Sequence, residues 1–365
     1  MTVNDTQAQP ATTPQPAPGS DPQSDPGSNP GSNPGSATAG PALTFSGVSL
    51  TLNRPGSAPL RLVEDVSLRL GRGERLALVG ESGSGKSVLA RAVLGLDRQI
   101  EVSGEIRVGD ESLAGAGERR LRAIRGRRVA MVFQNATGAL DPLMSVGAQL
   151  TEPMRYRGVT GRAARAAAAA LLSDLGIADA ARRLRAYPHE FSGGMQQRVA
   201  LAMALAAQPE ILLADEPTTA LDVRAQEQVM ALIDQVSRER GLSVLLISHD
   251  LSLVAGFADR VAVMYAGRIV HDDPVDAVFD APAHPYTRGL LGAIPAIGRR
   301  TGRLPAIEGT MPSPGRRPGG CAFHPRCPQR LDRCAEVIPP AAATASGGRV
   351  ACHLHDQDPS TGGER

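Results

Sequence analysis

The chain has 365 residues, of which 42% are hydrophobic and 21% charged, and its formal net charge is +2. This is the composition of a globular protein with room for one large or two moderate domains. The small net charge gives no general attraction to nucleic acid, and no apolar run approaches the roughly 20 residues needed to span a bilayer. The N-terminus shows no basic segment followed by an apolar one, so we expect a cytosolic chain without a secretory signal.

The first 41 residues differ in composition from the rest. They are mainly Pro, Gly, Ser, Asn, Gln and Thr, and they include a short repeat over 25–36. Because such a segment buries too little to offset its ordering entropy, we predict that it is disordered. After it, apolar residues alternate from Leu43 to Leu70, which predicts β-strands, and residues 104–110 resemble a further strand and turn. Together they predict a small antiparallel sheet.

An eight-residue glycine-rich motif lies between a predicted strand at 76–79 and a predicted helix at 88–94 that stops at Gly95. It matches the P-loop pattern in full, with the residues Gly80, Glu81, Ser82, Gly83, Ser84, Gly85, Lys86 and Ser87. In such a loop the backbone N–H groups and the helix dipole bind phosphate. Lys86 is the only lysine of the chain and would meet the β- and γ-phosphates, while the hydroxyl of Ser87 would hold Mg²⁺.

The remaining chain alternates between strands and helices. Strands are predicted at 128–133, 211–214 and 244–247, a hairpin at 261–270, and helices between about 141 and 190. Polar residues follow the strands, as expected for an open α/β sheet with its site along the carboxyl edge.

Three stretches near this edge carry chemistry. Asp215 ends a strand, where its carboxylate can reach the Mg²⁺ bound by Ser87. Glu216 is placed to polarise a water for attack on the γ-phosphate. A second anion site is predicted where a helix opens with the capping hydroxyl and free N–H groups of Ser192, Gly193 and Gly194. One nucleotide rarely needs two such sites, so this one is expected to serve the nucleotide of a second subunit.

The order of these motifs resembles that of ABC-transporter ATPases over about residues 43–280. The resemblance implies a P-loop NTPase fold of class α/β, with a RecA-like core, an antiparallel β-subdomain and a helical subdomain. It also implies the Q-loop at Gln134, the signature at 192–195, the D-loop at Asp222 and a γ-phosphate switch at His249. Met195 departs from the family's usual Gln. Leu52 stands where an aromatic residue usually stacks on adenine, which leaves adenine held by apolar contact alone.

All four cysteines lie in the last part of the chain, at Cys321, Cys327, Cys334 and Cys352. Their spacing lacks the C-x2-C pairs of zinc ribbons, and cytosolic disulfides are rare. Four thiolates in a proline-rich region fit an iron–sulfur cluster, while zinc or free thiols remain as alternatives. The segments at 284–291 and 321–328 resemble the C-terminal extension of oligopeptide and dipeptide importer ATPases, and this resemblance implies a 4Fe–4S cluster on the four cysteines.

The expected organisation is a disordered segment at 1–41, a nucleotide-binding domain at 42–280 with its helical subdomain at about 138–205, an extension at 281–356 and a tail at 357–365. The resemblance implies an ATPase that binds ATP and Mg²⁺ and powers peptide import from the cytoplasmic face of the membrane. Its implied partners are a second ATPase subunit, which would make a heterodimer, two permeases and an extracytoplasmic solute-binding protein. Import of nickel or another solute is one alternative. A soluble ABC ATPase acting on nucleic acid is another, although no nucleic acid is expected as a partner.

Overall fold

The computed structural model describes residues 40–218, 222–294 and 307–356. Residues 1–39 lie outside this description, so the disorder expected for residues 1–41 stays a prediction. The tail at 357–365 and two residues of the D-loop motif, Ala220 and Leu221, also lie outside it. Within the described ranges, no helix combines the length and the apolar character that crossing a membrane requires.

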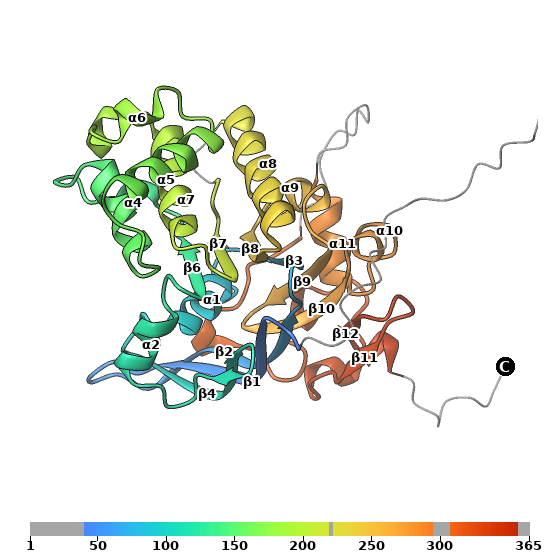
Figure 1. The fold of residues 1–365 in the computed structure, drawn as a ribbon. Coiled ribbons are helices and arrows are strands. Elements are labelled where there is room, and N and C mark those ends of the chain that lie inside the picture. Colours follow the sequence, from blue (N-terminus) through green and yellow to red (C-terminus); the bar gives the residue numbers. More distant parts are fainter. Residues whose placement is uncertain (1–39, 219–221, 295–306, 357–365) are drawn as a thin grey trace, which may run out of the picture. The chain divides into compact units, whose positions relative to one another are not determined.

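An antiparallel sheet of four strands forms the first part of the described chain, as the alternating apolar pattern predicts (Figure 1). Its strands lie in the order β2, β1, β4, β5, with the bounds Leu60–Leu70, Leu43–Leu52, Ile100–Val108 and Glu111–Ser112. Val66, Leu68 and Leu70 of β2 are buried because they pack into a core shared with the main sheet. Strand β4 begins at Ile100, whereas the prediction placed its start at 104. Its first four residues are mostly exposed and carry no apolar pattern, so periodicity could not reveal them.

The main sheet has eight strands among the described residues, in the order β11, β12, β10, β9, β3, β8, β7, β6. Strands β9, β3, β8, β7 and β6 are parallel, with the bounds Arg260–Tyr265, Arg75–Val79, Ser243–Ser248, Ile211–Asp215 and Val129–Val132. Strands β7 and β8 are buried along their whole length, which is why their sequences are continuous apolar runs. The carboxyl ends of these strands meet at one edge of the sheet.

Alternate residues of the parallel strands enter two different cores. Leu213 and Leu245 pack with the antiparallel sheet and with α1 (Lys86–Leu94), whereas Leu212 and Leu246 pack in a core built with other helices. Those helices include α7 (Gly193–Ala206), α8 (Val223–Arg240) and α9 (Leu251–Ala255). A short helix, α2 (Glu118–Ile124), follows the antiparallel sheet.

A group of helices, coloured in shades of green in Figure 1, lies beside the main sheet and includes α7. Its other members are α3 (Ala136–Ala139), α4 (Val146–Arg155), α5 (Gly161–Asp174) and α6 (Ala180–Arg183), together with a 3₁₀ turn at Pro188–Glu190. The helices expected between about 141 and 190 include α5, which is rich in alanine and buries Ala164, Ala168, Leu171 and Leu172 on one face. This face packs against α4 and α7.

The end of the described chain joins the main sheet instead of standing apart from it. Strand β10 (Arg268–Pro274) pairs with β12 (Arg349–Ala351), and β12 pairs with β11 (Ala341–Ala343). Helices α10 (Val275–Asp280) and α11 (Pro285–Gly292) lie between β10 and β11 in the chain. Four 3₁₀ turns lie at Pro314–Arg316, His324–Arg326, Asp332–Ala335 and His353–His355. The described residues from Gly40 onward form one compact unit, so a boundary at residue 281 stays a prediction.

Candidate functional site

The P-loop connects β3 to α1 at the carboxyl edge of the main sheet, as the sequence predicts. Gly80 adopts φ +151° and lies so close to β9 that a Cβ at this position would come within 2.2 Å of the carbonyl oxygen of Met264. Gly83 and Gly85 also have positive φ values, of +84° and +108°. These glycines let the backbone wind into a compact loop, and the helix begins directly after Gly85.

Lys86 folds back over this loop. Its Nζ donates hydrogen bonds to the carbonyl oxygens of Gly80 and Glu81, at 2.8 and 2.9 Å, and to the hydroxyl of Ser84 at 3.3 Å. Burial lowers the pKa of Lys86, although the negative charges of Glu216, Asp215 and Glu81 oppose this effect. The ammonium group is therefore buried beside the loop whose N–H groups would receive phosphate, where an anionic ligand would stabilise it.

Ser87, the residue after Lys86, is in direct contact with Asp215. The Ser87 hydroxyl donates a hydrogen bond of 2.7 Å to Oδ1 of Asp215 at the end of β7. Burial raises the pKa of Asp215, and the hydrogen bond from Ser87 partly offsets this. Among the described residues, no three His, Cys, Asp or Glu side chains gather closely enough to hold a metal ion by themselves. A magnesium ion at Ser87 and Asp215 would therefore take its other ligands from phosphate oxygens and water, as Mg²⁺ commonly does.

Three predicted residues come together around one carboxylate. Glu216 lies just beyond β7 with a positive φ of +47°, and its side chain is 12% exposed. Its Oε2 accepts a hydrogen bond of 2.8 Å from Nε2 of Gln134, and its Oε1 lies 3.2 Å from Nδ1 of His249. The three residues follow the ends of three neighbouring strands, β7, β6 and β8, so the parallel sheet brings them together.

The second predicted anion site lies at the start of α7. Ser192 is the N-cap residue, and its hydroxyl accepts a hydrogen bond from the N–H of Met195 at 3.4 Å. Ser192 and Gly193 are exposed and Gly194 is half-buried, so the first turn of this helix is open to a ligand. Gln197 on the same helix donates a hydrogen bond to the carbonyl of Pro217, which links α7 to the chain just beyond Glu216.

Asp222 begins α8. Its Oδ1 accepts a hydrogen bond of 2.9 Å from the N–H of Ala225, as an N-cap residue does. This contact gives Asp222 a structural task in the described part of the chain, and its expected D-loop role stays a prediction.

The four cysteines converge. The pKa values of Cys321, Cys327 and Cys352 are raised, first by burial and further by the neighbouring thiols, and that of Cys321 reaches about 11. The backbone N–H of Cys321 donates to the carbonyl of Cys334 at 2.8 Å, which fixes the spacing of two of the four. Cys321 interacts electrostatically with the other three thiols, but among the described residues no three such side chains gather closely enough to hold a metal ion, so the cluster implied by the resemblance stays a prediction.

Two residues that touch the P-loop were not predicted as site residues. Tyr286 of α11 accepts a hydrogen bond from the N–H of Glu81, and Arg326 forms an ion pair with the carboxylate of Glu81. Both lie in sequence segments that stand out only through their family resemblance, at 284–291 and 321–328. No spacing rule connects them to a loop more than 200 positions earlier, so no sequence pattern could have predicted these two contacts.

The protein families that match the chain agree with this site. The description "ABC transporter" matches residues 63–219, and "Oligopeptide/dipeptide transporter, C-terminal region" matches residues 272–334. A putative peptide import ATP-binding protein of Brucella abortus is 47% identical over 313 residues, which cover 85% of this chain and 93% of that protein. The dipeptide transport ATP-binding protein DppD of Bacillus subtilis is 43% identical, with 82% of this chain and 90% of that protein covered.

Solved structures agree as well. The dimeric structure of a bacterial ABC transporter cassette is 29% identical, with a TM-score of 0.58, and covers 64% of this chain and 98% of the cassette. The predicted fold class, a P-loop NTPase of the ABC type with an antiparallel sheet and a helical subdomain, is thereby confirmed. The chain belongs to the ABC transporter ATPases, enzymes that bind and hydrolyse ATP, and among them to those that carry the oligopeptide/dipeptide transporter C-terminal region.

Proposed function

We propose that this chain is the ATP-hydrolysing subunit of an importer that carries dipeptides or oligopeptides across the cell membrane. The observation that carries the proposal is the C-terminal region at 272–334 on a chain with a complete P-loop site. Relatives that share most of their length with this chain bear the names of peptide, oligopeptide and dipeptide transport proteins. Nickel or another small solute carried by the same machinery is the alternative.

The site geometry supports a definite division of labour. Ser87 and Asp215, already joined by a hydrogen bond, would hold Mg²⁺ together with Gln134, and the ion would neutralise charge on the phosphates. Lys86 exchanges the carbonyl oxygens of the P-loop for the β- and γ-phosphates. Glu216 orients the attacking water, and His249 holds the γ-phosphate. Before ATP binds, Gln134 and His249 instead hold the carboxylate of Glu216, which keeps the three groups aligned.

The exposed first turn of α7 supports pairing with a second ATPase subunit. Ser192 and Gly193 present a helix N-terminus that suits an anion, and this chain already has a phosphate site in its own P-loop. Each P-loop of the pair would be closed by the signature segment of the other subunit, with Asp222 at the junction. We propose a heterodimer with a related but different ATPase, and the dimeric form of the solved cassette is compatible with such pairing.

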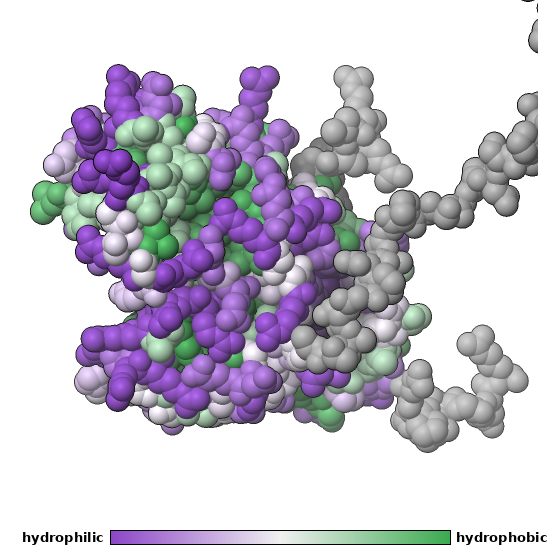
Figure 2. All heavy atoms as spheres, viewed as in Figure 1, coloured by the Kyte–Doolittle hydropathy of each residue, from purple (hydrophilic) through white to green (hydrophobic). Residues whose placement is uncertain are grey.

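The helical subdomain offers a surface for permeases. Several apolar and aromatic side chains in this subdomain or just before it are exposed, among them Phe133, Leu143, Tyr156 and Tyr187, and Leu143 is 86% exposed. Figure 2 shows hydrophobic residues on the part of this subdomain that faces the viewer. Large exposed apolar groups of this kind mark protein contacts. Two permeases would dock there and hold the ATPase at the cytoplasmic face of the membrane, while an extracytoplasmic solute-binding protein delivers the cargo.

The pairing can be tested with Glu216→Gln, which removes the water-orienting carboxylate but keeps the hydrogen-bonding shape. Hydrolysis should slow by at least about 100-fold, because general-base catalysis contributes on that scale. ATP should then trap a stable complex with the partner ATPase, visible by size-exclusion chromatography. The wild-type pair should dissociate as ATP is consumed. A Glu216→Gln variant that binds ATP but stays monomeric beside its partner would contradict the shared site.

We propose further that Cys321, Cys327, Cys334 and Cys352 hold a 4Fe–4S cluster. The support is the donor set, since four cysteines without the C-x2-C pairs of zinc ribbons suit a Cys₄ cluster, and the charge of Cys321 interacts with those of the other three. Such a cluster supplies one-electron chemistry and can staple a loop region. Protein purified without oxygen should be brown and contain about four iron and four sulfide per chain, as a Cys₄ cluster requires. Stoichiometric zinc, or neither metal, would overturn this assignment.

A further inference from the structure

Glu81, the second residue of the P-loop, is held on all its polar groups. Its carbonyl oxygen accepts a hydrogen bond from Lys86 at 2.9 Å. Its backbone N–H donates to the hydroxyl of Tyr286 at 2.9 Å, and its carboxylate lies 2.9 Å from Nη1 of Arg326. The first of these contacts comes from the loop itself, and the other two come from the C-terminal extension.

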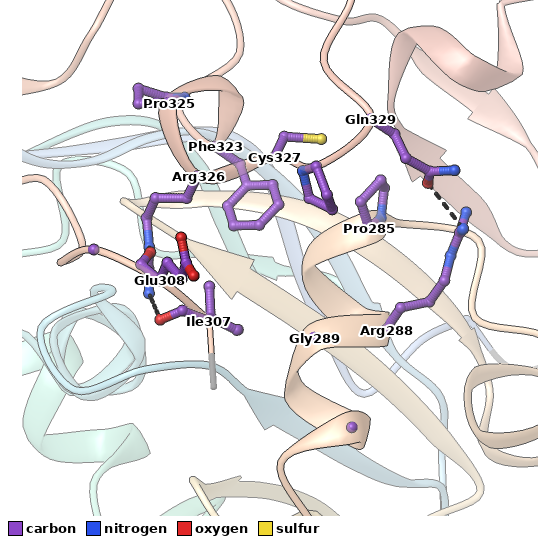
Figure 3. A pocket seen from close by; sticks show the side chains of 13 residues that line it. Pro285, Arg288, Gly289, Ile307, Glu308, Phe323, Pro325, Arg326, Cys327 and Gln329 are labelled. Atoms are coloured by element: carbon purple, nitrogen blue, oxygen red, sulfur yellow. Dashed lines mark hydrogen bonds between the residues drawn. The ribbon is translucent and has the colours of Figure 1, made fainter. Parts of the chain in front are cut away.

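The two extension residues are themselves rigidly placed. Tyr286 is fully buried and packs edge-on against Tyr265, with ring centroids 4.6 Å apart. The Arg326 side chain is only 7% exposed, and it also donates to the carbonyl oxygens of Glu308 and Ile307, as Figure 3 shows. A side chain fixed by several partners loses little entropy when it holds another group. The extension therefore holds the P-loop with preformed groups.

A third contact comes from another part of the extension. A Cβ placed on Gly83 would lie 3.3 Å from Cε of Met311, so this methionine packs directly on the middle of the P-loop. The contacts of Tyr286, Met311 and Arg326 are spread over the described part of the extension, from α11 to the turn at His324–Arg326. Three separate segments of the described extension therefore contact the loop.

The charge of Glu81 explains why the support includes an arginine. Its carboxylate is near enough to Lys86 for the two charges to interact. Left unpaired, this carboxylate would repel a triphosphate on the P-loop and compete with it for Lys86, since like charges in a partly buried site are weakly screened. Arg326 pairs with the carboxylate and cancels that effect.

We propose that Arg326 and Tyr286 are positioning residues of the ATP site: they fix the first turn of the P-loop, and Arg326 neutralises Glu81 beside the phosphates. The C-terminal extension is then part of the nucleotide-binding machinery. The inference rests on the ATP site of the family and does not depend on the transported solute or on what the cysteines hold.

The test is ATP affinity in a double-mutant cycle on the purified full-length chain. Because the chain has no Trp, binding is followed with a fluorescent ATP analogue or by calorimetry. Arg326→Gln should raise the Kd for ATP about three- to tenfold, the scale of one uncompensated charge near a polyanion. Adding Glu81→Gln should bring the Kd back to within about twofold of wild type, because the repelling charge is gone. A purely structural role for Arg326 predicts no such rescue.

Two further variants keep the test decisive. Arg288 lines the same cavity as Arg326 but bonds to Gln329 instead of the P-loop (Figure 3), so Arg288→Gln should leave the Kd for ATP unchanged. Glu81→Gln alone does not alter any residue of the extension and should bind ATP at least as tightly as wild type. If Arg326→Gln fails to fold, weaker binding by Glu81→Gln would overturn the charge argument. If it folds, wild-type affinity in Arg326→Gln, or a double variant no better than that single variant, would overturn it.

Tyr286→Phe examines the other contact. It removes only the hydroxyl that accepts from the Glu81 N–H and keeps the ring in its aromatic cluster. We expect a Kd for ATP raised about two- to fivefold, the scale of one hydrogen bond. An unchanged Kd would remove Tyr286 from the proposal.

Discussion

Asp215 shows how a single residue can be costly to the fold and useful to the site. It is 5% exposed, and burial raises its pKa. An acid whose pKa is higher in the folded chain binds its proton more tightly there than in the unfolded chain. The ionised carboxylate therefore destabilises the fold at pH values above the folded-state pKa. This cost disappears as the pH falls below the unfolded value, and Mg²⁺ would remove it at neutral pH.

The expected consequence is a variant that is more stable and less functional. Without Mg²⁺ and nucleotide, Asp215→Asn should raise the free energy of unfolding at pH 7, because asparagine places no charge in the buried site. Its Oδ1 can still accept from Ser87. The gain should shrink toward pH 4, and the stabilisation that Mg²⁺ and ATP give the wild type should be weaker. Urea titrations at pH 7 and pH 4, with and without Mg²⁺ and ATP, measure the free energy of unfolding of both proteins.

Asp97 provides the matched control, since it is an exposed carboxylate outside the site. Asp97→Asn should change the free energy of unfolding by less than about 0.5 kcal/mol, as surface substitutions usually do. An Asp215→Asn variant less stable than wild type at pH 7 would show that the charge of Asp215 is favourable in the folded chain.

Among the helices and strands, those that a local sequence pattern determines could be predicted from the sequence. The buried runs of β7 and β8 and the one-sided helix α5 follow from periodicity, and the glycine motif sets the turn between β3 and α1. The start of β4 was missed because its first residues, Ile100–Ser103, are exposed or half-buried and carry no pattern.

The place of the end of the chain in the fold could not be predicted from local patterns, for a different reason. Its composition suggested a separate piece, yet Val350 of β12 pairs with His271 of β10 and extends the main sheet. Pairing between strands so far apart leaves no periodic trace in either segment. The contacts of Tyr286 and Arg326 with Glu81 are equally non-local, so the predicted site contained Glu81 but not its two partners.

For the whole molecule, the described chain places the P-loop, Asp215 and the contacts of Glu216 with Gln134 and His249 along one edge of a parallel sheet. The first turn of α7 stays exposed for a partner, and the helical subdomain shows exposed apolar groups suited to permeases. From this arrangement we expect the chain to hydrolyse ATP rapidly only within an assembly. The extension contacts the same edge through Glu81. A change in the conformation of the extension would therefore alter nucleotide binding.

The most direct measurement is the ATPase rate of the complete importer, rebuilt in membranes from this chain, its partner ATPase, both permeases and the solute-binding protein. We predict that short peptides raise the rate severalfold, that nickel salts do not, and that a complex carrying Lys86→Met shows no stimulation. Addition of nucleic acid should have no effect. Stimulation by nickel or by nucleic acid, with none by any peptide, would contradict the account.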